Sequence, residues 1–376
     1  MGRRDAEAFE RLMGEAAECV KAGRLDEAAL RYRRALRHQP NEWIALAHLG
    51  ACERFAGRLS EAERVLRQAL LVAPEEPGTL NELALVTAAA GRRAEAIAYL
   101  DRATRAAPGF LQGWTNLGKL LYVEHMEEEA AGRPAPDRRA RLVACFERVL
   151  ALDPSQAEFR LLKDAVSGAR VEAPPEGYVA AFFDRFAAGF DDKVAGRLRY
   201  SAPAVAAEML ADLAPSGVRV LDLGCGTGLS GQVARACASR LAGVDLSPGM
   251  LARAAELGIY DELVEEDVAA FLARTPAAAY DLVLALDVFI YVGALEGVLG
   301  GVSRALASGG RVLFSVETLD GQGFRLEPSA RFSHSRAYVE NAAAAAGLVL
   351  REARAFAVRE EAGRAIAAIL FDFRKP

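Results

Sequence analysis

The sequence predicts two domains of different architecture: an α-helical superhelix of repeats at residues 1–168, and an α/β domain with a mostly parallel sheet at residues 178–376. Two observations support this division. The first half repeats one pattern at intervals of 34 residues, which is typical of stacked helix pairs. The second half alternates short apolar strands with helices, as parallel sheets covered by helices do. Residues 169–177 are rich in Pro, Ala and Glu and form the expected linker.

Glycines and prolines mark the repeats of the first half. The tripeptide Ala-Gly-Arg recurs with its glycines at Gly23, Gly57 and Gly91. A proline closes each unit, at Pro40, Pro74 and Pro108. Glycine permits the tight turn between two helices, and proline ends the second helix of each pair. This pattern resembles the tetratricopeptide (TPR) repeat, and the resemblance implies a concave groove that binds peptides or proteins.

A fourth unit is irregular. It ends at Pro154, and its excess length falls within residues 124–137, where we expect a charged loop or a helix extension. Residues 155–167 are expected to form a capping helix. The acidic run at 127–129 is interpreted as a solvated helix face, with a docking role as the alternative. The alternative to partner binding is an array that only packs on the second domain or forms a homodimer.

Composition argues against several classes of function. The chain has 376 residues, a formal net charge of −5 and no basic excess in either half, so a nucleic-acid partner is not expected. No apolar signal segment or membrane span is recognisable, so the expected location is the cytoplasm, without a membrane partner. The five cysteines are scattered and form no metal-ligand pattern, so no metal is expected.

The organising segment of the second domain is VRVLDLGCGTG at residues 218–228. It predicts a buried strand and a glycine loop, followed by a helix at 229–238, which together bring backbone N–H groups against a ligand. Gly226, Gly228 and Gly231 also fit the dinucleotide pattern GxGxxG. Asp222 argues against a diphosphate, because a carboxylate at this loop repels phosphate and attracts a ligand with an ammonium group.

The order Asp-Leu-Gly-Cys-Gly-Thr-Gly resembles motif I of the class I S-adenosylmethionine (SAM)-dependent methyltransferases. The resemblance implies a Rossmann-like α/β domain with a mostly parallel seven-stranded sheet, and SAM as the cofactor. The cofactor-binding residues that it implies in this segment are Asp222, Gly224, Cys225, Gly226 and Gly228. The alternative is a glycine-rich turn in an unrelated α/β domain.

A second strand at 241–245 ends in Asp245, about 20 residues after the first acid, and an acid at that distance accepts the hydroxyls of an adenosine ribose. Leu246 and Met250 follow, where they contact adenine or pack in the core. A third strand at 263–268 ends in Asp267 and Val268, which the resemblance places at the exocyclic amine of adenine.

The fourth strand, at 280–287, resembles motif IV and contributes Leu286 to the cofactor site. Asp287 at its end and Tyr291 just beyond it are candidate catalytic residues, because ligands of such sheets bind outside the carboxyl ends of the strands. A helix N-cap is the alternative role for Asp287.

The remaining elements are a helix at 294–307, a strand at 311–317, a helix at 335–346, and an antiparallel hairpin at 348–358 and 364–373. The segment after the strand at 311–317 is expected to define the substrate. His334 is a candidate general base, because the ordinary pKa of histidine lies near neutrality; a capping or surface role is the alternative. Arg331 and Tyr338 are candidate substrate-binding residues, and Arg331 can hold a carboxylate.

An aromatic segment precedes the first strand. Its pattern FDxFAxxFDxxL, beginning at Phe183, resembles the entry segment of bacterial TPR-containing predicted methyltransferases. We expect a helix that either covers the SAM cleft as a lid or packs in the core. Tyr200, at the end of this segment, is the expected polar contact to substrate.

These features predict a SAM-dependent methyltransferase that modifies an O or N acceptor on a small molecule or on a carrier or peptide. The TPR array would bind a protein partner or make a homodimer. The alternative function is a scaffold whose second domain binds SAM without turnover, and a dehydrogenase is the weaker third hypothesis. The acceptor and the methylated atom cannot be predicted from the sequence.

Overall fold

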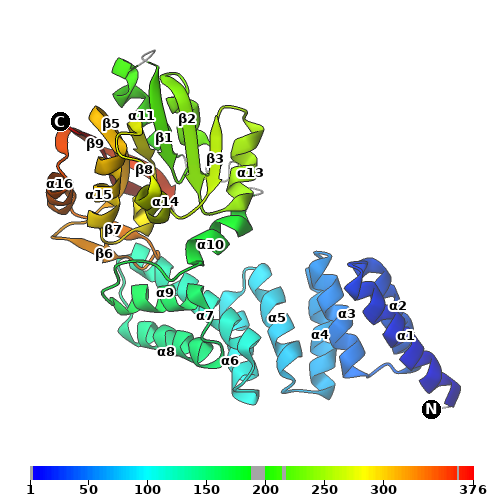
Figure 1. The fold of residues 1–376 in the computed structure, drawn as a ribbon. Coiled ribbons are helices and arrows are strands. Elements are labelled where there is room, and N and C mark those ends of the chain that lie inside the picture. Colours follow the sequence, from blue (N-terminus) through cyan, green and yellow to red (C-terminus); the bar gives the residue numbers. More distant parts are fainter. Residues whose placement is uncertain (1–2, 188–199, 214–216, 362–363) are drawn as a thin grey trace. The chain divides into compact units, whose positions relative to one another are not determined.

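The computed structural model describes residues 3–187, 200–213, 217–361 and 364–376 (Figure 1). The chain divides into two compact units, Met1–Gln156 and Ala157–Pro376. This division falls before the predicted boundary at 168, because helix α9 (Ala157–Ser167) is grouped with the second unit.

The first unit consists of helices that pack in consecutive pairs (Figure 1). They are α1 (Arg3–Lys21), α2 (Leu25–His38), α3 (Trp43–Phe55), α4 (Leu59–Val72), α5 (Pro77–Ala89), α6 (Arg93–Ala106), α7 (Leu111–Ala130) and α8 (Pro136–Leu152). Gly23, Gly57 and Gly91 lie between the two helices of a pair with φ of +71°, +75° and +79°, a left-handed conformation that glycine adopts without strain. The predicted repeat of helix pairs is therefore confirmed.

Small residues allow these helices to approach closely. The alanines at equivalent positions of the repeats are all fully buried: Ala28, Ala35, Ala62, Ala69, Ala96 and Ala103. At Gly50, an added Cβ would lie 2.4 Å from Cγ of Leu66 on the paired helix. A larger residue at Gly50 would therefore force α3 and α4 apart.

A recurring hydrogen bond joins neighbouring repeats. The Gln68 side chain donates to the carbonyl of Pro40 at 3.4 Å, and Arg102 donates to the carbonyl of Pro74 at 2.7 Å. Arg148 donates to the carbonyl of Pro108 at 2.8 Å. In each case the second helix of one repeat binds the proline that closes the repeat before it, so the closing prolines also fix the stacking of the repeats.

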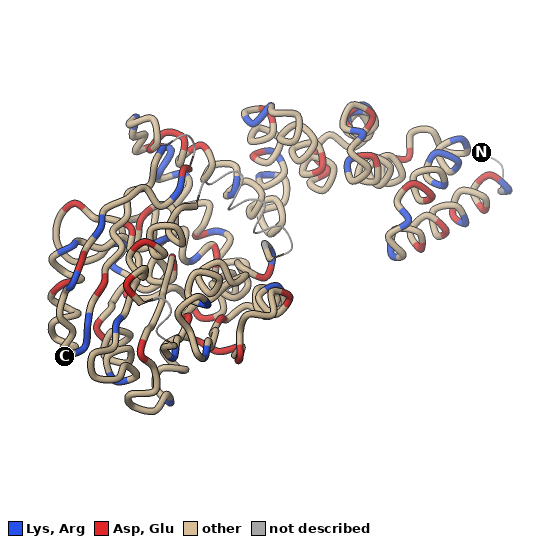
Figure 2. The backbone as a smooth tube through the Cα atoms, turned by 90° about the horizontal axis from the view of Figure 1, so that it is seen from above, with Lys and Arg blue, Asp and Glu red and all other residues tan. Residues whose placement is uncertain are grey.

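The extra residues of the fourth unit lengthen its helices. α7 has 20 residues and α8 has 17, whereas α5 and α6 have 13 and 14. The structure thus resolves the expected alternatives in favour of a helix extension. Within the acidic run, Glu127 pairs with Arg93 at 2.5 Å and Glu128 pairs with Arg138. Basic and acidic residues are interspersed along the whole array (Figure 2).

The second unit contains a twisted sheet with strand order β3-β2-β1-β4-β5, all parallel. β9 then pairs antiparallel with β5, and β8 pairs antiparallel with β9. The strands are β1 (Val218–Leu223), β2 (Ala238–Asp245), β3 (Glu262–Glu265), β4 (Tyr280–Ala285), β5 (Leu306–Thr318), β8 (Val349–Glu361) and β9 (Arg364–Arg374). These seven strands and the antiparallel hairpin confirm the predicted fold.

Two short strands were not predicted. β6 (Phe324–Leu326) and β7 (Phe332–His334) form a small hairpin, and β7 pairs with the end of β5. Three residues per strand are too few to produce a recognisable period. The helix expected at 229–238 is shorter than predicted. Helix α12 spans Leu229–Ala234, and strand β2 begins four residues after its end.

Helices cover both faces of the sheet. α14 (Val268–Arg274), α15 (Glu296–Ala305) and α16 (Arg336–Ala345) pack on one face, against alternate residues such as Leu221, Val283 and Phe314. α11 (Ala202–Met209) and α12 pack on the other face, against the intervening residues, such as Val220 and Leu284. Helix α13 (Pro248–Glu256) follows β2, and α10 (Tyr178–Phe186) precedes the sheet. The carboxyl ends of the parallel strands are thereby left open for a site.

Candidate active site

A cleft of about 800 Å³ opens at the carboxyl ends of the parallel strands. Residues that directly follow β1, β2 and β4 line it, and so does Asp267, two positions after the end of β3. The predicted cofactor residues that line this cleft are Gly224, Cys225, Gly226, Asp245, Leu246, Met250, Asp267, Val268 and Leu286. Sequence segments far apart in the chain therefore meet at one place, as the strand pattern predicted.

The glycine loop is tied to strand β2. The N–H of Cys225 donates to the carbonyl of Val244 at 3.0 Å, and the N–H of Gly226 donates to Oδ2 of Asp245 at 2.8 Å. Gly224 has φ of +62°, and an added Cβ would lie 2.5 Å from Cγ2 of Val288. Only glycine combines this conformation with so close a neighbour.

Asp245 joins the loop to the start of helix α13. Its Oδ1 accepts from the N–H of Ser247 at 2.9 Å, while Oδ2 holds Gly226. Burial raises the pKa of this carboxyl, although the backbone N–H groups oppose the shift. Each carboxylate oxygen has a second lone-pair site, so Asp245 can accept two hydroxyl donors from a ligand in the cleft.

Asp222 does not lie where the sequence argument placed it. Its side chain is fully buried, and it is not among the described residues that line the cleft. The hydroxyl of Ser230 donates to it at 2.8 Å and the hydroxyl of Tyr260 at 2.7 Å. Burial raises its pKa to about 7 against these two hydrogen bonds. The carboxylate supports the loop from beneath and does not face a ligand, which corrects the predicted contact with an ammonium group.

Tyr260 was missed by the sequence analysis, and its side chain packs against three glycines. An added Cβ at Gly231 would lie 2.0 Å from the Tyr260 hydroxyl oxygen, and one at Gly243 would lie 2.9 Å from its ring. Gly228, with φ of +98°, also faces this ring at 3.2 Å and is absent from the cleft lining. Two glycines of the GxGxxG pattern, Gly228 and Gly231, therefore make room for the partly buried side chain of Tyr260. No sequence signal distinguished Tyr260 from an ordinary core tyrosine.

The adenine side of the predicted site has one polar group among apolar ones. Asp267 caps helix α14, because its Oδ1 accepts from the N–H groups of Ala269 at 2.9 Å and Ala270 at 3.0 Å. Its Oδ2 has no partner among the described residues, so it can accept from a ligand amine. Leu246, Met250 and Leu286 supply the apolar surface.

Helix α10 forms one wall of the cleft, through residues that include Val179, Phe182 and Phe183. The Phe183 ring meets the Tyr291 ring edge to face, with centroids 5.4 Å apart. Asp184 Oδ1 accepts from Ser247 Oγ at 2.5 Å, which anchors the helix at the start of α13. The structure thus favours the lid over plain core packing. Phe190 and the later positions of the aromatic pattern lie outside the described residues.

A polar network lies where strand β4 ends. Asp287 has φ of +56°; its N–H donates to Ser315 Oγ at 2.8 Å and its Oδ2 accepts from Arg359 at 3.0 Å. Arg359 also donates to Glu361 at 2.6 Å and to Glu317, and Arg331 donates to the same oxygen of Glu361 at 2.6 Å. Burial raises the pKa of Asp287 and of Glu317 in spite of both guanidinium groups.

Three predicted residues at or beside this network border the cleft. Tyr200, Tyr291 and Arg331 all line it, as predicted, and burial raises the pKa of both tyrosines. Arg359 lines it too, although the sequence analysis did not identify it. Its strand pairs with β9 through two register shifts, one of them between Ala357 and Arg359, so its orientation could not be read from an alternating pattern.

His334 and Tyr338 do not line the cleft, which corrects both expectations. His334 is fully buried, and its Nε2 lies 2.9 Å from the carbonyl of Val292 and 3.0 Å from that of Gly293. It therefore donates from Nε2, and burial lowers its pKa to about 4. The Tyr338 hydroxyl bonds to Glu296 and to the Leu295 N–H, each at 2.8 Å. Both residues hold the 292–296 segment in place.

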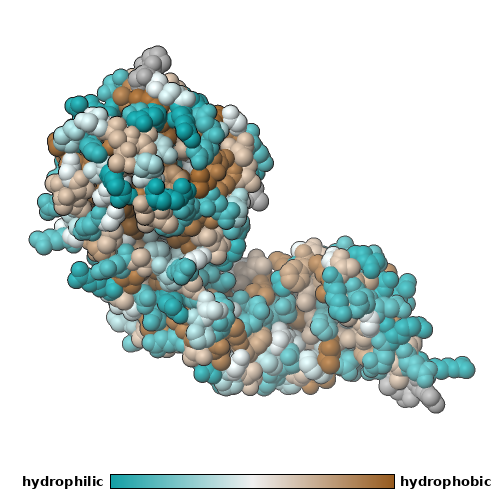
Figure 3. Space-filling model, viewed as in Figure 1, coloured by the Kyte–Doolittle hydropathy of each residue, from teal (hydrophilic) through white to brown (hydrophobic). Residues whose placement is uncertain are grey.

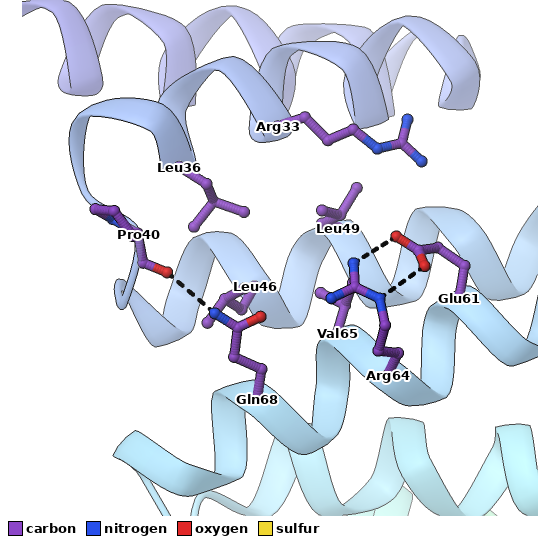
Figure 4. A pocket seen from close by; sticks show the side chains of 9 residues that line it. All are labelled: Arg33, Leu36, Pro40, Leu46, Leu49, Glu61, Arg64, Val65 and Gln68. Atoms are coloured by element: carbon purple, nitrogen blue, oxygen red, sulfur yellow. Dashed lines mark hydrogen bonds and ion pairs between the residues drawn. The ribbon is translucent and has the colours of Figure 1, made fainter.

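A second hollow of about 250 Å³ lies in the repeat unit, between α2, α3 and α4 (Figure 4). Leu36, Leu46 and Leu49 contribute its apolar surface. The Arg64 guanidinium binds Glu61 through two hydrogen bonds, of 2.9 and 2.7 Å. The hollow is a seam between stacked repeats, and its carboxylate, Glu61, is paired with Arg64.

Two absences hold for the described ranges. No cluster of three or more His, Cys, Asp and Glu side chains is arranged there to hold a metal ion. None of the helices in these ranges has the length and apolar character that crossing a bilayer requires.

Comparisons with known proteins agree with both halves of the fold. Residues 221–312 match the family model described as a methyltransferase domain, and residues 20–78 match that of a tetratricopeptide repeat. Over 107 residues the chain is 37% identical to methyltransferase-like protein 27 of Homo sapiens, and the matched region covers 27% of this chain and 43% of that protein. Over 114 residues it is 37% identical to trans-aconitate 2-methyltransferase of Paracidovorax citrulli (strain AAC00-1), covering 30% and 42%.

The chain thus spans less than half the length of these two relatives. Among solved structures it is similar to the [4+2]-cyclase SpnF, with 19% identity, a TM-score of 0.46, and coverage of 55% of this chain and 98% of that one. It is also similar to the N-methyltransferase NodS from Bradyrhizobium japonicum WM9 in complex with S-adenosyl-L-homocysteine, with 19% identity, a TM-score of 0.41, and coverage of 52% and 98%.

Proposed function

We propose that this chain, which joins tetratricopeptide repeats to a methyltransferase domain, transfers a methyl group from SAM to an O or N acceptor on a small molecule or on a carrier or peptide. The observation that carries the proposal is the meeting of Asp245, Asp267 and the glycine loop in one cleft under an aromatic helix. Each of these parts fits a different portion of SAM.

The fit can be tested group by group. Asp245 is held by Gly226 and Ser247 and keeps lone pairs for the two ribose hydroxyls. The free Oδ2 of Asp267 accepts from the adenine amine, and Leu246 and Met250 pack on the adenine ring. The glycine loop leaves space for the amino-acid portion, since an added Cβ at Gly226 would meet nothing within 4 Å.

SAM supplies an electrophilic methyl group on a sulfonium, and the chain supplies position and enclosure. Phe182 and Phe183 exclude water on the side of the lid. A site without water favours methyl transfer, in which the positive charge leaves the sulfonium. Asp287 and Tyr291 face the acceptor end, where a carboxylate or a phenol can orient or deprotonate the acceptor. His334 takes no part, because it lies outside the cleft and is neutral.

The scaffold hypothesis, in which SAM binds without turnover, is the second candidate. Against it stands the network of Asp287, Arg359 and Glu317, whose charged groups are largely withdrawn from water. Charges so placed are costly to bury and do not help to bind SAM at Asp245 or Asp267.

The repeat array is proposed to bind a protein partner or a second copy of the chain. Apolar side chains such as Phe55 and Leu71 are exposed on it, and the face shown in Figure 3 has apolar patches among hydrophilic ones. Exposed apolar residues of this kind suit protein contacts.

Calorimetric titration of the full chain with SAM, compared for wild type, Asp245→Ala and Asp137→Ala, tests the proposal. Asp137 is an exposed acid of the repeat unit and is not among the predicted ligand contacts, so its substitution is the matched control. Wild type and the control are expected to bind SAM alike, and Asp245→Ala at least tenfold more weakly. Transfer of labelled methyl to protein or small molecules of a cell extract then separates an enzyme from a scaffold.

A further inference from the structure

The network at the end of β4 contains more carboxylates than guanidinium groups. Three acids, Asp287, Glu317 and Glu361, surround two arginines, Arg331 and Arg359. Arg359 is only 5% exposed, and its Nε, Nη1 and Nη2 each donate to a different one of these carboxylates. With all groups ionised, the network carries a formal charge of −1.

Among the residues that the structure describes, the rest of the cleft lining adds no compensating cation. The charged residues that line it are Glu176, Asp245, Asp267, Asp287, Arg331 and Arg359. Both arginines of this set are those already paired in the network. The remaining lining is rich in apolar groups, among them Phe182, Ile290 and Val292. A carboxylate bound here would be a further anion in a poorly solvated space, whereas a cation would be attracted.

Asp287 is the acid that can meet such a cation. It lines the cleft and is 22% exposed, whereas Glu317 is 10% exposed and lies behind it. The Ser315 hydroxyl lies 3.3 Å from Asp287 Oδ1, and Arg359 holds Oδ2, so the carboxylate is fixed on two sides. Its left-handed backbone, at φ +56°, is a conformation that costs free energy and that Asp and Asn tolerate best after glycine.

We propose that the methyl acceptor is an amine that Asp287 binds in its ammonium form. This inference rests on the proposed function and narrows its acceptor. Tyr291 and Tyr200, which border the same chamber, offer neutral hydroxyls to the amine, and the lid and the apolar wall receive the rest of an apolar amine. Arg331 is then a partner of Glu361 and not the holder of a substrate carboxylate.

The chemistry balances with the groups present. The ammonium gives one proton to the Asp287 carboxylate, and its nitrogen lone pair forms the N–CH₃ bond while the CH₃–S bond breaks with its electron pair passing to sulfur. The products are S-adenosylhomocysteine (SAH) and an N-methylated ammonium, whose positive charge remains beside the acidic network. Burial raises the pKa of Asp287, so its carboxylate accepts a proton more readily than an exposed aspartate does and is a better general base.

The test uses binding, because the acceptor itself is unidentified. The probes are SAH, which is a neutral thioether, and sinefungin, a SAM analogue in which a carbon bearing an amino group replaces the methylated sulfur. Calorimetric titration of the full chain with each probe gives a preference ratio. A charge-assisted hydrogen bond to Asp287 predicts that wild type binds sinefungin roughly tenfold to a hundredfold more tightly than SAH.

Asp287→Asn is the informative variant, since asparagine tolerates the left-handed backbone and removes only the charge. Because the charge beside the amine is lost, we expect the variant to bind sinefungin less than about threefold more tightly than SAH. Its affinity for SAH should stay within about twofold of wild type. Asp137→Asn, at an exposed acid of the repeat unit, is the control and should retain the wild-type ratio. A thermal melt of each variant shows that the domain is folded.

The outcomes separate the two proposals. If wild type binds both probes with equal affinity, or if Asp287→Asn retains the preference, the amine inference is wrong and the methyltransferase proposal stands. If wild type binds neither SAM nor SAH, the proposed function fails, and the amine inference fails with it.

Discussion

The substitution Tyr260→Phe tests the reinterpretation of Asp222. It removes only the hydroxyl that donates to Asp222 at 2.7 Å and retains the ring that packs against Gly231 and Gly243. Asp222 is fully buried and, among the described residues, would keep only Ser230 as a hydrogen-bond donor from a side chain. The loss of a buried hydrogen bond to a charged group costs about 1.5–3 kcal/mol, and to a neutral one about 0.5–1.5 kcal/mol.

The size of this loss depends on pH, because the folded protein raises the pKa of Asp222 from 3.8 to about 7. The folded state therefore holds a proton that the unfolded state has released between pH 4 and 7, so this group's contribution to stability falls as pH rises through that range. The full fall amounts to about 4 kcal/mol. In Tyr260→Phe the pKa rises further, and the deficit relative to wild type is expected to grow from about 1 kcal/mol at pH 5 to about 2 kcal/mol at pH 8.

The assay can follow the two units separately. Both tryptophans, Trp43 and Trp114, lie in the repeat unit, so urea unfolding monitored by tryptophan fluorescence reports on the array alone. Hydrogen exchange of peptides that cover β1 and β2 reports on the second unit. Tyr260→Phe should accelerate exchange in β1, more at pH 8 than at pH 5 once intrinsic rates are corrected, and leave the fluorescence transition unchanged.

Equal effects at pH 5 and pH 8 would show that Asp222 does not change protonation in this range. An unchanged exchange rate at both values would show that the Tyr260 hydroxyl does not support the loop, and the reinterpretation would be wrong.

Three other predictions follow from the same contacts. Gly231→Ala places a Cβ 2.0 Å from the Tyr260 hydroxyl, so SAM affinity measured by calorimetry should fall at least tenfold, and the double variant with Tyr260→Phe should recover part of it; no loss would contradict the packing argument. Asp245→Ala should weaken SAM binding by about 1.5–3 kcal/mol, and an affinity equal to that of Asp137→Ala would show that Asp245 is misassigned. Glu53→Gln leaves Arg33 and Arg58 without the buried carboxylate that joins them. The urea midpoint of the fluorescence transition of the array should therefore fall, while hydrogen exchange in β1 stays the same. A change in both would show that the units do not unfold separately.

The sequence predicted the parts of the fold that repeat or alternate. The fixed interval between Gly23, Gly57 and Gly91 predicted where the turns of the array lie, because only glycine adopts φ near +75° without strain. Strands β1, β2 and β4 were identified from apolar runs that end in acids, and those acids stand at the cleft or beneath it because parallel strands end on the same edge. Local patterns of this kind depend on neighbouring residues alone.

The errors concern side chains whose role depends on distant partners. Asp222 was placed facing a ligand, but Tyr260, 38 residues later, takes its carboxylate as a partner. His334 was placed in the cleft, but the short strand β7 turns it toward the carbonyls of Val292 and Gly293. Arg359 was overlooked because β8 changes register beside it. In each case the decisive contact joins segments whose pairing leaves no trace in the local sequence.

Two calorimetric titrations of the full chain, one with SAM and one with NAD, test most directly whether the cleft binds SAM. We expect a saturable binding heat with SAM, weakened at least tenfold by Asp245→Ala, and no comparable heat with NAD. Saturable binding of NAD with no heat from SAM would contradict it, and the cleft at the ends of β1, β2 and β4 would then belong to a nucleotide-diphosphate enzyme.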